Sequence, residues 1–347
     1  MSVVLGLMSG TSLDGLDLCC VSFADNHDDF RILAVQTVPY SAIWKSKLEN
    51  AFYATTTEVD ALDKEYGVFL GEHITDFINT HSLPHIDLIA SHGHTVFHQP
   101  NRGITKQIGS GKEIAKHTGL QVVYDFRTQD VVLGGQGAPL VPIGDVILFN
   151  EYDACLNLGG FANVSFDMQK SRIAYDIGAC NLILNHFAQK LGYEYDDHGF
   201  IAQMGTCDES LLNELNNIDY YCFNPPKSLA REFAESQLLP LLSDYDEKIV
   251  LHTYIKHLGF QIGISLTKSK ATKCLVTGGG TYNRFLIDQI QQHTSCFLEI
   301  PDRTIVDYKE ALVFALLGLL RKENQINVLS SVTGAKHDHS SGRIAKP

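Results

Sequence analysis

Apolar residues near the start of the chain form three short runs separated by polar turns. Residues 3–7, 18–23 and 31–38 are each apolar enough for a strand, and the tight turn between the first two favours a hairpin. The first turn is rich in hydroxyl groups and contains Gly10 and Gly15, which can adopt positive φ and let a ligand approach the backbone. The pattern therefore predicts a strand hairpin whose turn is suited to binding.

The stretch after these runs has the helical period. Apolar residues recur every three or four positions over residues 57–80, which predicts a long helix, and residues 45–54 predict a shorter one. Residues 86–90 predict a buried strand, residues 107–119 a helix and residues 120–124 another strand. Such alternation of strands and helices is typical of an α/β protein.

The second half of the chain repeats this beginning. Residues 154–158 and 164–167 predict two strands around a second glycine-rich turn. Two such hairpins indicate a duplicated fold with one phosphate-binding turn from each half. A strand over residues 173–176 and a helix from about residue 182 to 191 are expected next.

A run of three glycines lies further along the second half. Residues 247–269 predict a long helix, residues 273–277 a strand and residues 284–293 a helix. The glycines at 278–280 separate this strand from the helix after it, and they let the backbone pass close to a flat ligand such as adenosine. A last apolar helix is expected over residues 312–320.

Composition narrows the class of protein. A chain of 347 residues is long enough for two domains, and no apolar run reaches the roughly eighteen residues that a membrane span needs, so we expect a cytoplasmic protein. The net charge of -13 argues against a nucleic-acid binder. The eight cysteines include no C-x-x-C pair, so buried free thiols are expected. We expect the polar tail over residues 333–347 to be loosely ordered.

The first turn carries the side chains expected of a phosphate site. Ser9, Thr11 and Ser12 add hydroxyl groups to the backbone N–H groups of the turn. Asp14 and Asp17 would repel a phosphate, so they suggest a divalent cation or a sugar hydroxyl between them and the ligand. An ordinary glycine and serine turn fits the hairpin equally well.

Three histidines, His92, His94 and His98, follow the strand predicted at residues 86–90. They suggest a zinc site, but no cysteine or carboxylate lies beside them at ligand spacing. A polar sugar-binding loop explains them better, because open α/β sheets bind ligands at the carboxyl ends of their strands.

Charged side chains follow two further predicted strands and precede the last helix. Asp125 and Arg127 are one residue apart at a strand end, so they either contact one polyol or form a surface ion pair. Asp176 ends another strand before a helix, where it is either a general base or a helix N-cap. Glu310 lies near the start of the last predicted helix, where the helix dipole favours it with or without a function.

Together these motifs resemble one known family. They occur in order along nearly the whole chain, as MSGTSLDGLD (8–17), SHGHTV (91–96), DFR (125–127), GGQGAPLVP (134–142), NLGGFAN (157–163), PPKS (225–228), GGG (278–280) and KEA (309–311). Each is weak alone, but the ordered set resembles the 1,6-anhydro-N-acetylmuramic acid kinases, members of the actin, sugar-kinase and chaperone-ATPase superfamily.

The resemblance implies a two-lobed, actin-like α/β fold, a duplicated ribonuclease-H-like fold with ATP and Mg²⁺ in an interlobe cleft. Residues 1–148 and 309–347 would form the N-terminal lobe and residues 149–308 the C-terminal lobe, with the glycine- and proline-rich segment at 134–142 as a hinge or crossover. The implied partners are ATP and an anhydro sugar, and a homodimer is expected; no nucleic acid or membrane partner is expected.

The resemblance also assigns site residues. The nucleotide would be held by Gly10, Thr11, Ser12, Leu13, Asp14, Gly15, Leu16, Asp17, Gly159, Gly160, Gly278, Gly279 and Gly280, with Asp14 directed at Mg²⁺ directly or through water. The sugar would be contacted by His94, Thr95, Asp125, Arg127 and Glu310. Asp176 would activate the water that opens the anhydro bridge while O6 takes the γ-phosphoryl group, which gives N-acetylmuramic acid 6-phosphate.

The chain departs from the family pattern behind this aspartate. The family commonly has Asp-Thr-Gly-Pro-Gly-Asn, whereas DIGACN stands at residues 176–181, with Asn185 where an acidic residue is common and Asp145 where histidine is frequent. Two alternatives therefore stay open: a levoglucosan-type anhydro-sugar kinase, and an ATP-binding protein of the same superfamily without turnover.

Overall fold

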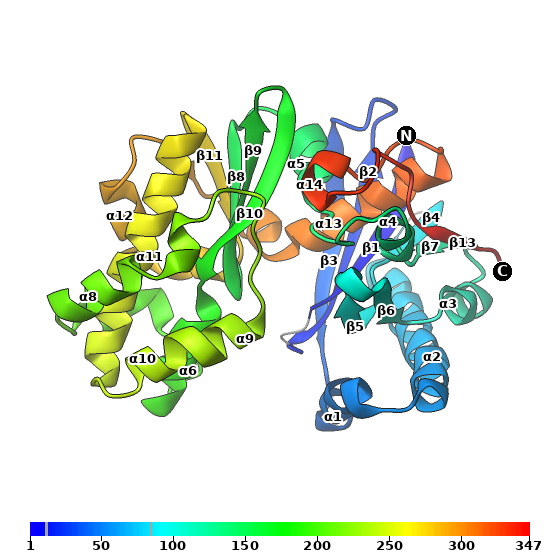
Figure 1. Ribbon diagram of the computed structural model, residues 1–347. Helices are drawn as coiled ribbons and strands as arrows, with labels where there is room; N and C mark the ends of the chain where they lie inside the picture. The colour runs from blue at the N-terminus through cyan, green and yellow to red at the C-terminus, as the bar shows by residue number, and fades with distance from the viewer. Residues whose placement is uncertain (11–12, 84) are drawn as a thin grey trace. The chain divides into compact units, whose positions relative to one another are not determined.

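The computed structural model describes residues 1–10, 13–83 and 85–347, which divide into two units. Unit 1 contains Met1–Asn150 and Tyr308–Pro347, and unit 2 contains Glu151–Asp307. Each unit has its own sheet and its own helices (Figure 1). None of the described helices combines the length and the apolar character that a membrane crossing requires.

Unit 1 is built on a mixed sheet with the strand order β13-β7-β4-β1-β2-β3. The first three strands form an antiparallel meander, β4 and β7 continue from β1 in parallel, and β13 closes the edge in antiparallel pairing with β7. The strands are β1 (Ser2–Ser9), β2 (Gly15–Phe23), β3 (Phe30–Pro39), β4 (Leu88–Ser91), β7 (Val122–Tyr124) and β13 (Arg343–Ala345). A separate two-stranded sheet consists of β5 (His94–Gln99) and β6 (Ile104–Ile108).

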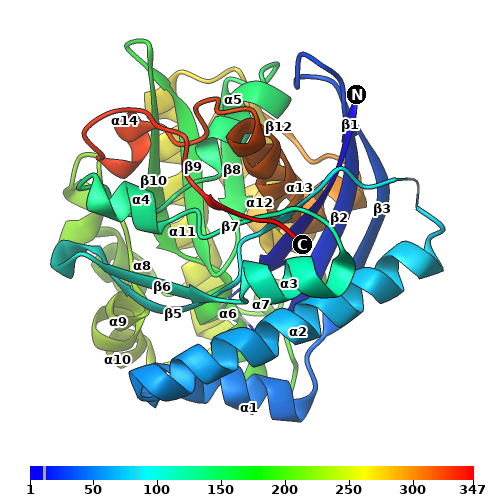
Figure 2. The same ribbon diagram turned by 90° about the vertical axis from the view of Figure 1, so that its right-hand side faces the viewer.

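Helices cover both faces of this sheet. They are α1 (Ala42–Asn50), α2 (Thr56–Thr80), α3 (Gly111–Thr118), α4 (Thr128–Val132), α5 (Pro142–Leu148), α13 (Arg303–Lys322), which begins in unit 2, and α14 (Ser330–Thr333). In β1, Leu5 and Leu7 pack into the core that includes Tyr66 of α2, and α3 lies beside α2 (Figure 2). Gly6 points to the opposite face, where an added Cβ would lie 2.0 Å from the Ala311 carbonyl oxygen of α13. The strand alternation therefore fixes which helix lies on which face.

Unit 2 has the strand order β10-β9-β8-β11-β12. Its strands are β8 (Ala154–Leu158), β9 (Phe161–Met168), β10 (Ser171–Ala179), β11 (Lys273–Thr277) and β12 (Phe297–Glu299). Its helices are α6 (Asn181–Lys190), α7 (Phe200–Gln203), α8 (Glu209–Asn216), α9 (Arg231–Phe233), α10 (Leu239–Leu242), α11 (Glu247–Ser269) and α12 (Arg284–Gln292). β8, β9 and β10 form an antiparallel meander, and β11 and β12 continue from β8 in parallel.

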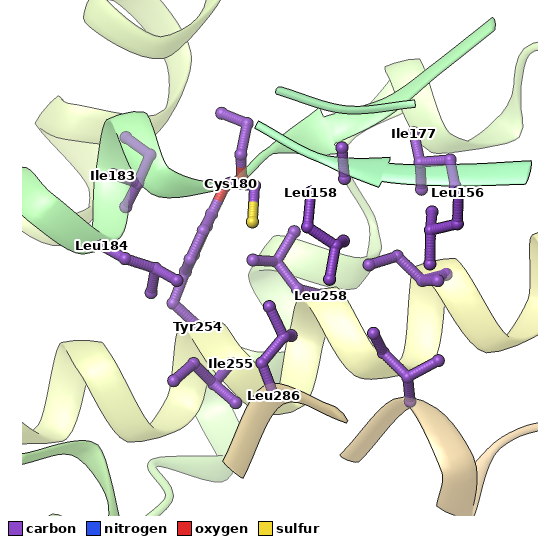
Figure 3. Close-up of a cluster of buried hydrophobic side chains, with 14 of the residues drawn as sticks. Leu156, Leu158, Ile177, Cys180, Ile183, Leu184, Tyr254, Ile255, Leu258 and Leu286 are labelled. Atoms are coloured by element: carbon purple, nitrogen blue, oxygen red, sulfur yellow. The ribbon is translucent and has the colours of Figure 1, made fainter. Parts of the chain in front are cut away.

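The core of unit 2 lies between this sheet and α11. Leu158 and Ile177 of the sheet pack near Tyr254 and Leu258 of α11, with Cys180 among them (Figure 3). Burying each large apolar side chain stabilises the unit by about 1.5–3 kcal/mol. Burial raises the pKa of the Cys180 thiol to about 12, so the cysteine behaves as a packing residue. This agrees with the prediction that most cysteines are buried free thiols.

The two units share one strand path. Unit 1 follows the order β3-β2-β1-β4-β7 and unit 2 the order β10-β9-β8-β11-β12, each with an antiparallel meander followed by two parallel strands. The predicted fold class, a duplicated α/β fold of the actin-like kind, is confirmed. The predicted strand at residues 273–277 and helix at residues 247–269 also match β11 and α11.

Two predicted elements are wrong. Residues 107–119 are not one helix, because β6 ends at Ile108 and α3 begins only at Gly111, where the Ser110 hydroxyl accepts a hydrogen bond from the Glu113 N–H group. The C-terminal tail is not loosely ordered. It adds β13 to the sheet, and the buried Ser341 hydroxyl donates a 2.6 Å hydrogen bond to the carbonyl oxygen of Phe126.

The last long helix starts earlier than predicted. The Asp302 carboxylate accepts hydrogen bonds from the N–H groups of Thr304 (2.8 Å) and Ile305 (3.2 Å), so α13 begins at Arg303. Glu310 therefore lies well inside the helix, and the helix dipole does not explain it. The segment at residues 134–142 is likewise not a crossover between the units, because it is followed by α5 and lies within unit 1.

Candidate active site

The hairpin turn between β1 and β2 is the predicted phosphate site of unit 1. Thr11 and Ser12 lie outside the described residues. Gly10 and Leu13 lie on either side of these two residues. Leu13 has a φ of 59°, and its N–H group donates a 3.4 Å hydrogen bond to the carbonyl oxygen of Gly10. Gly15 is required because an added Cβ would lie 2.6 Å from a carbonyl oxygen of β3. Leu13 and Gly15 therefore have fixed places next to Gly10 and β3.

The predicted cofactor residues after this turn have different surroundings. Asp14 is exposed, whereas Asp17 accepts a 2.6 Å hydrogen bond from the Thr37 hydroxyl of β3. Leu16 is part of the buried core. The described residues contain no cluster of three His, Cys, Asp or Glu side chains at metal-binding distance. One exposed carboxylate fits a Mg²⁺ ion that takes most of its ligands from water and phosphate.

A buried polar chain connects the end of β1 to β5. The Tyr40 hydroxyl donates a 2.7 Å hydrogen bond to the Ser9 hydroxyl, which is 3.1 Å from Nδ1 of His94. Burial lowers the pKa of His94 to about 4, so the ring is neutral. Next to it, Thr95 accepts a hydrogen bond from Gln107 of β6 at 3.3 Å. The side chain of His94 therefore has a fixed place and one ring nitrogen left for a ligand.

A second polar group forms around Arg127. Its Nε–H group donates a 3.0 Å hydrogen bond to Nε2 of His92. Burial lowers the pKa of Arg127 to about 10, against the opposing charge of Glu310. The Glu310 side chain is solvent-exposed, yet the protein packed around it raises the pKa of its carboxyl group. The structure therefore brings Arg127, Glu310 and His92 into one group.

Asp125 has hydrogen-bond and ion-pair partners of its own. It adopts a φ of 56°, and its Oδ1 accepts hydrogen bonds from the N–H group (3.3 Å) and the hydroxyl (2.6 Å) of Thr128 at the start of α4. Its Oδ2 lies 3.1 Å from Nε of Arg343 in β13. Asp125 and Arg127 therefore have separate partners, and the expected common direction of their side chains is not seen.

Asp176 lies inside β10, not at its end. The pairing with β9 shifts register between Asp176 and Gly178, so Ile177 forms a bulge next to the aspartate. Oδ2 of Asp176 accepts a 2.8 Å hydrogen bond from the N–H group of Leu229, and its carbonyl oxygen accepts one from the Tyr220 hydroxyl at 2.6 Å. Burial raises the pKa of the Asp176 carboxyl group, against the opposing effect of the Leu229 N–H group.

The bulged end of β10 is tied to the second glycine turn. The N–H groups of Cys180 and Asn181 donate hydrogen bonds to the carbonyl oxygens of Gly160 (2.7 Å) and Gly159 (3.1 Å). The Asn181 side chain donates to the carbonyl oxygen of Leu158 at 3.0 Å. Cys180, not Asp176, is the N-cap of α6, so the helix-cap alternative for Asp176 is wrong.

The glycine run after β11 packs directly on this turn. An added Cβ at Gly278 would lie 2.5 Å from Oδ1 of Asn157, and one at Gly280 would lie 2.7 Å from Cβ of Leu158. At Gly279 the nearest atom would be 3.7 Å away, so this residue faces open space. Unit 2 thus has one continuous backbone surface, formed by the second glycine turn, the glycine run and the strand that contains Asp176.

His92 is expected in a polar sugar-binding loop, and it lies one residue beyond the end of a buried strand, but its contact with Arg127 is not indicated by the sequence. Two further features of the site have no local signal at all. Tyr40 and the N–H group of Leu229 act through contacts with distant residues. Nothing in their local sequence indicates these contacts.

Comparisons with known proteins agree with one another. A family model described as anhydro-N-acetylmuramic acid kinase matches residues 2–347. The protein of that name from Sulfurimonas denitrificans is 33% identical over 370 residues, with 98% of each chain covered. Proteins of the same name from Bacillus cereus (strain Q1; 32% identical, 99% of each chain) and Vibrio parahaemolyticus (33% identical, 97% of this chain and 96% of the other) are similarly close.

Proposed function

The chain belongs to the anhydro-N-acetylmuramic acid kinase family, and from this premise we propose that it converts 1,6-anhydro-N-acetylmuramic acid, ATP and water into N-acetylmuramic acid 6-phosphate and ADP. The anhydro sugar is a fragment of peptidoglycan, so the reaction would belong to cell-wall recycling. Because ATP is the phosphoryl donor, we place the reaction in the cytoplasm. A homodimer, which the family resemblance suggests, stays a prediction.

The observation that carries this proposal is the surroundings of Asp176. Its carboxylate is oriented by the N–H group of Leu229, its pKa is raised by burial, and the strand that holds it is bonded to the glycine turn at Gly159 and Gly160. A base and a phosphate-binding backbone are therefore fixed within one unit, as a reaction that activates water beside a phosphoryl transfer requires.

The nucleotide would be held mainly by backbone groups. Gly278 and Gly280 can pack against the second glycine turn only without a Cβ, while Gly160 has no atom within 4 Å of an added Cβ. This open glycine surface fits the flat adenosine and the phosphates of ATP. When bound, Mg²⁺ would neutralise charge on the phosphates, and the exposed Asp14 is the residue proposed to face it, directly or through water.

Asp176 would act as the general base of the hydrolytic half of the reaction. It would take a proton from water, whose oxygen then bonds to the anomeric carbon as the bond from that carbon to O6 breaks. O6 would bond to the γ-phosphorus as the bond to the bridging oxygen of ADP breaks. The electron pair released from the acetal thus becomes the nucleophile, so a separate general acid is not required.

The sugar would be held by side chains of unit 1. The proposed contacts to the sugar are His94 and Thr95 of β5, Arg127 and Glu310. Asp125 would contact the sugar too, and its hydrogen bonds also hold the start of α4. Neutral His94 can donate from one ring nitrogen and accept at the other, which suits a sugar hydroxyl.

A phosphorylation assay tests the proposal. The full chain is incubated with ATP, Mg²⁺ and 1,6-anhydro-N-acetylmuramic acid, beside levoglucosan and a control without sugar, and the product is analysed by mass spectrometry. We expect one ADP for each sugar, and a product that gains one phosphoryl group and one water. ADP release without sugar, preference for levoglucosan, or a product that gains phosphate but no water would contradict the proposal.

A further inference from the structure

We propose that His92 is a positioning residue of the sugar site, held in its neutral form with the proton on Nδ1, and that it directs the two Nη nitrogens of Arg127 at neighbouring oxygen atoms of the sugar. This inference rests on the proposed anhydro-sugar kinase activity, because it assumes that Arg127 contacts the sugar. It adds a residue that touches neither substrate and acts through another side chain.

The hydrogen bonds of His92 determine where its proton lies. Arg127 has only donors, so the Nε–H group that points at Nε2 of His92 at 3.0 Å requires a lone pair on that nitrogen. The single ring proton is therefore on Nδ1, 2.8 Å from the carbonyl oxygen of Gly93, which accepts it. A protonated ring would place two N–H groups and two positive charges against each other.

The surroundings of the ring leave it little freedom. His92 is 3% exposed, and its backbone N–H group donates a 3.1 Å hydrogen bond to the carbonyl oxygen of Leu7. The centre of its ring lies 4.7 Å from the ring centre of Phe314 in α13. Gly93 has a φ of 75°, and an added Cβ would lie 2.5 Å from the carbonyl oxygen of Ile108, so the acceptor of the Nδ1 proton is held as well. Both ends of the ring are fixed.

Charges around the ring favour the same state. Burial lowers the pKa of His92 well below its ordinary value, and the positive charge of Arg127 and the rings of His94 and His98 act in the same direction. Both effects favour the neutral ring, in which Nε2 can accept the hydrogen bond from Arg127.

The hydrogen bond to His92 uses the Nε–H group of Arg127 and leaves its two Nη nitrogens for other acceptors. Among residues 1–10, 13–83 and 85–347, the hydrogen bond to His92 is the only one that the Arg127 side chain makes. With Nε engaged, Arg127 presents the planar pair of Nη nitrogens, which suits two adjacent oxygen acceptors. The charge of Glu310 acts on this guanidinium group, so the carboxylate lies near it.

The test compares variants by their Michaelis constants. His92→Leu removes the acceptor, whereas His92→Gln keeps an amide oxygen near the place of Nε2 and a donor for Gly93. We expect His92→Leu to raise KM for the anhydro sugar by about 10- to 100-fold, since a hydrogen bond to a charged group is lost, with KM for ATP unchanged. His92→Gln should recover most of the loss. Equal losses in both variants, or a fall confined to kcat, would overturn the proposal.

A double variant checks that His92 acts through Arg127. Arg127→Lys lacks the planar fork, so His92→Leu should add little to it, and the combined rise in KM should be no larger than that of Arg127→Lys alone. Effects that multiply would overturn the proposal.

The proton position is measured on the unmodified chain, and the folded His92→Gln variant serves only to assign the signals of His92. In long-range ¹H–¹⁵N spectra of histidine-labelled protein, the signals that vanish in His92→Gln should show a protonated Nδ1 and an unprotonated Nε2. A proton on Nε2, or titration near neutral pH, would overturn the inference. If the unmodified chain fails to phosphorylate the muramyl sugar, the proposed function fails, whereas this spectrum still decides the state of His92.

Discussion

Units 1 and 2 follow the same strand path but fix their polar groups by different means. In unit 1 the contacts run from side chain to side chain, as in the hydrogen bonds of Ser9 with His94 and of Arg127 with His92. In unit 2 they run through the backbone, because N–H groups donate to the carbonyl oxygens of Gly159 and Gly160 and glycines pack where no Cβ fits.

This difference matches two kinds of ligand. Side chains carry distinct donors and acceptors, so they can distinguish one sugar from another, whereas backbone N–H groups bind phosphates in any nucleotide. If the comparison holds, substitutions in these side-chain contacts of unit 1 change KM for the sugar, and substitutions in the backbone surface of unit 2 change KM for ATP or kcat. Asp176 is the exception, because it is a side chain proposed to act as base in the unit that otherwise relies on its backbone.

The largest effect is expected when the carboxylate of Asp176 is removed. Asp176→Asn keeps an oxygen for the Leu229 N–H group but cannot take a proton from water, so kcat should fall about 10²- to 10⁴-fold while ATP affinity stays nearly unchanged. Steady-state rates and calorimetric titration with ATP check this. The matched control is Asp244→Asn, an equal loss of charge at an exposed position of unit 2. Substantial turnover in Asp176→Asn would remove its assignment as base.

A second effect tests the backbone surface of unit 2. Gly278 has a φ of 86° and a ψ of 159°, and an added Cβ would lie 2.5 Å from Asn157. Gly278→Ala should destabilise unit 2 by about 3 kcal/mol or more and raise KM for ATP. Gly192 has the same φ with no atom within 4 Å, so Gly192→Ala should cost only about 1 kcal/mol. Equal losses on urea unfolding would mean that strain, and not packing, explains the glycine.

The duplicated path was predictable because it depends on local patterns. Two glycine turns between apolar runs indicated the two hairpins, and period and length indicated the bounds of α11 and β11. The helix expected over residues 107–119 was wrong since residues 104–108 pair with β5, a contact that periodicity does not report. The start of α13 was missed although its cap, Asp302, is visible in the sequence.

The residues of the candidate site were predictable from the sequence, but the side chains that they contact were not. Arg127 and Asp125 were identified from one motif, yet their partners, His92 and Arg343, come from distant parts of the chain. The tail shows the same limit. Its polar residues indicate disorder when considered alone, whereas its backbone pairs with the edge of β7 and with Val328, both outside the tail itself.

The third effect concerns β13, the strand of unit 1 that has no counterpart in unit 2. Ser341→Ala removes the hydrogen bond to Phe126, in the loop that carries Arg127, so it should destabilise the protein by about 1–2 kcal/mol and raise KM for the sugar. The buried hydroxyl of the neighbouring Ser340 has no hydrogen-bond partner among the described residues, so Ser340→Ala should be neutral. Thermal unfolding of the two variants gives the comparison. A larger loss in Ser340→Ala would contradict this account of the tail.

A smaller effect is expected from Tyr40, which touches no proposed ligand. Tyr40→Phe removes the donor to Ser9, so it should cost about 1 kcal/mol in stability and raise KM for the sugar a few-fold by loosening His94. KM for ATP should not change. Tyr53→Phe, which deletes the hydroxyl of an exposed tyrosine, is the control. A rise in KM for ATP instead would show that the polar chain of unit 1 serves the nucleotide.

The smallest expected effect is a stability gain in Asp176→Asn. Burial raises the pKa of the Asp176 carboxyl group in the folded chain, so between its ordinary and its raised pKa the folded state binds more protons than the unfolded state. Stability from this group therefore falls as pH rises through that window, and the full penalty is present at neutral pH. Asn carries no charge, so the variant should unfold at slightly higher urea concentration than the unmodified protein at pH 7. The difference should shrink as the pH approaches about 4, where an ordinary aspartate becomes protonated. A variant less stable at neutral pH would show that the carboxylate is stabilised by its surroundings, and unit 2 would then hold its base at no cost to folding.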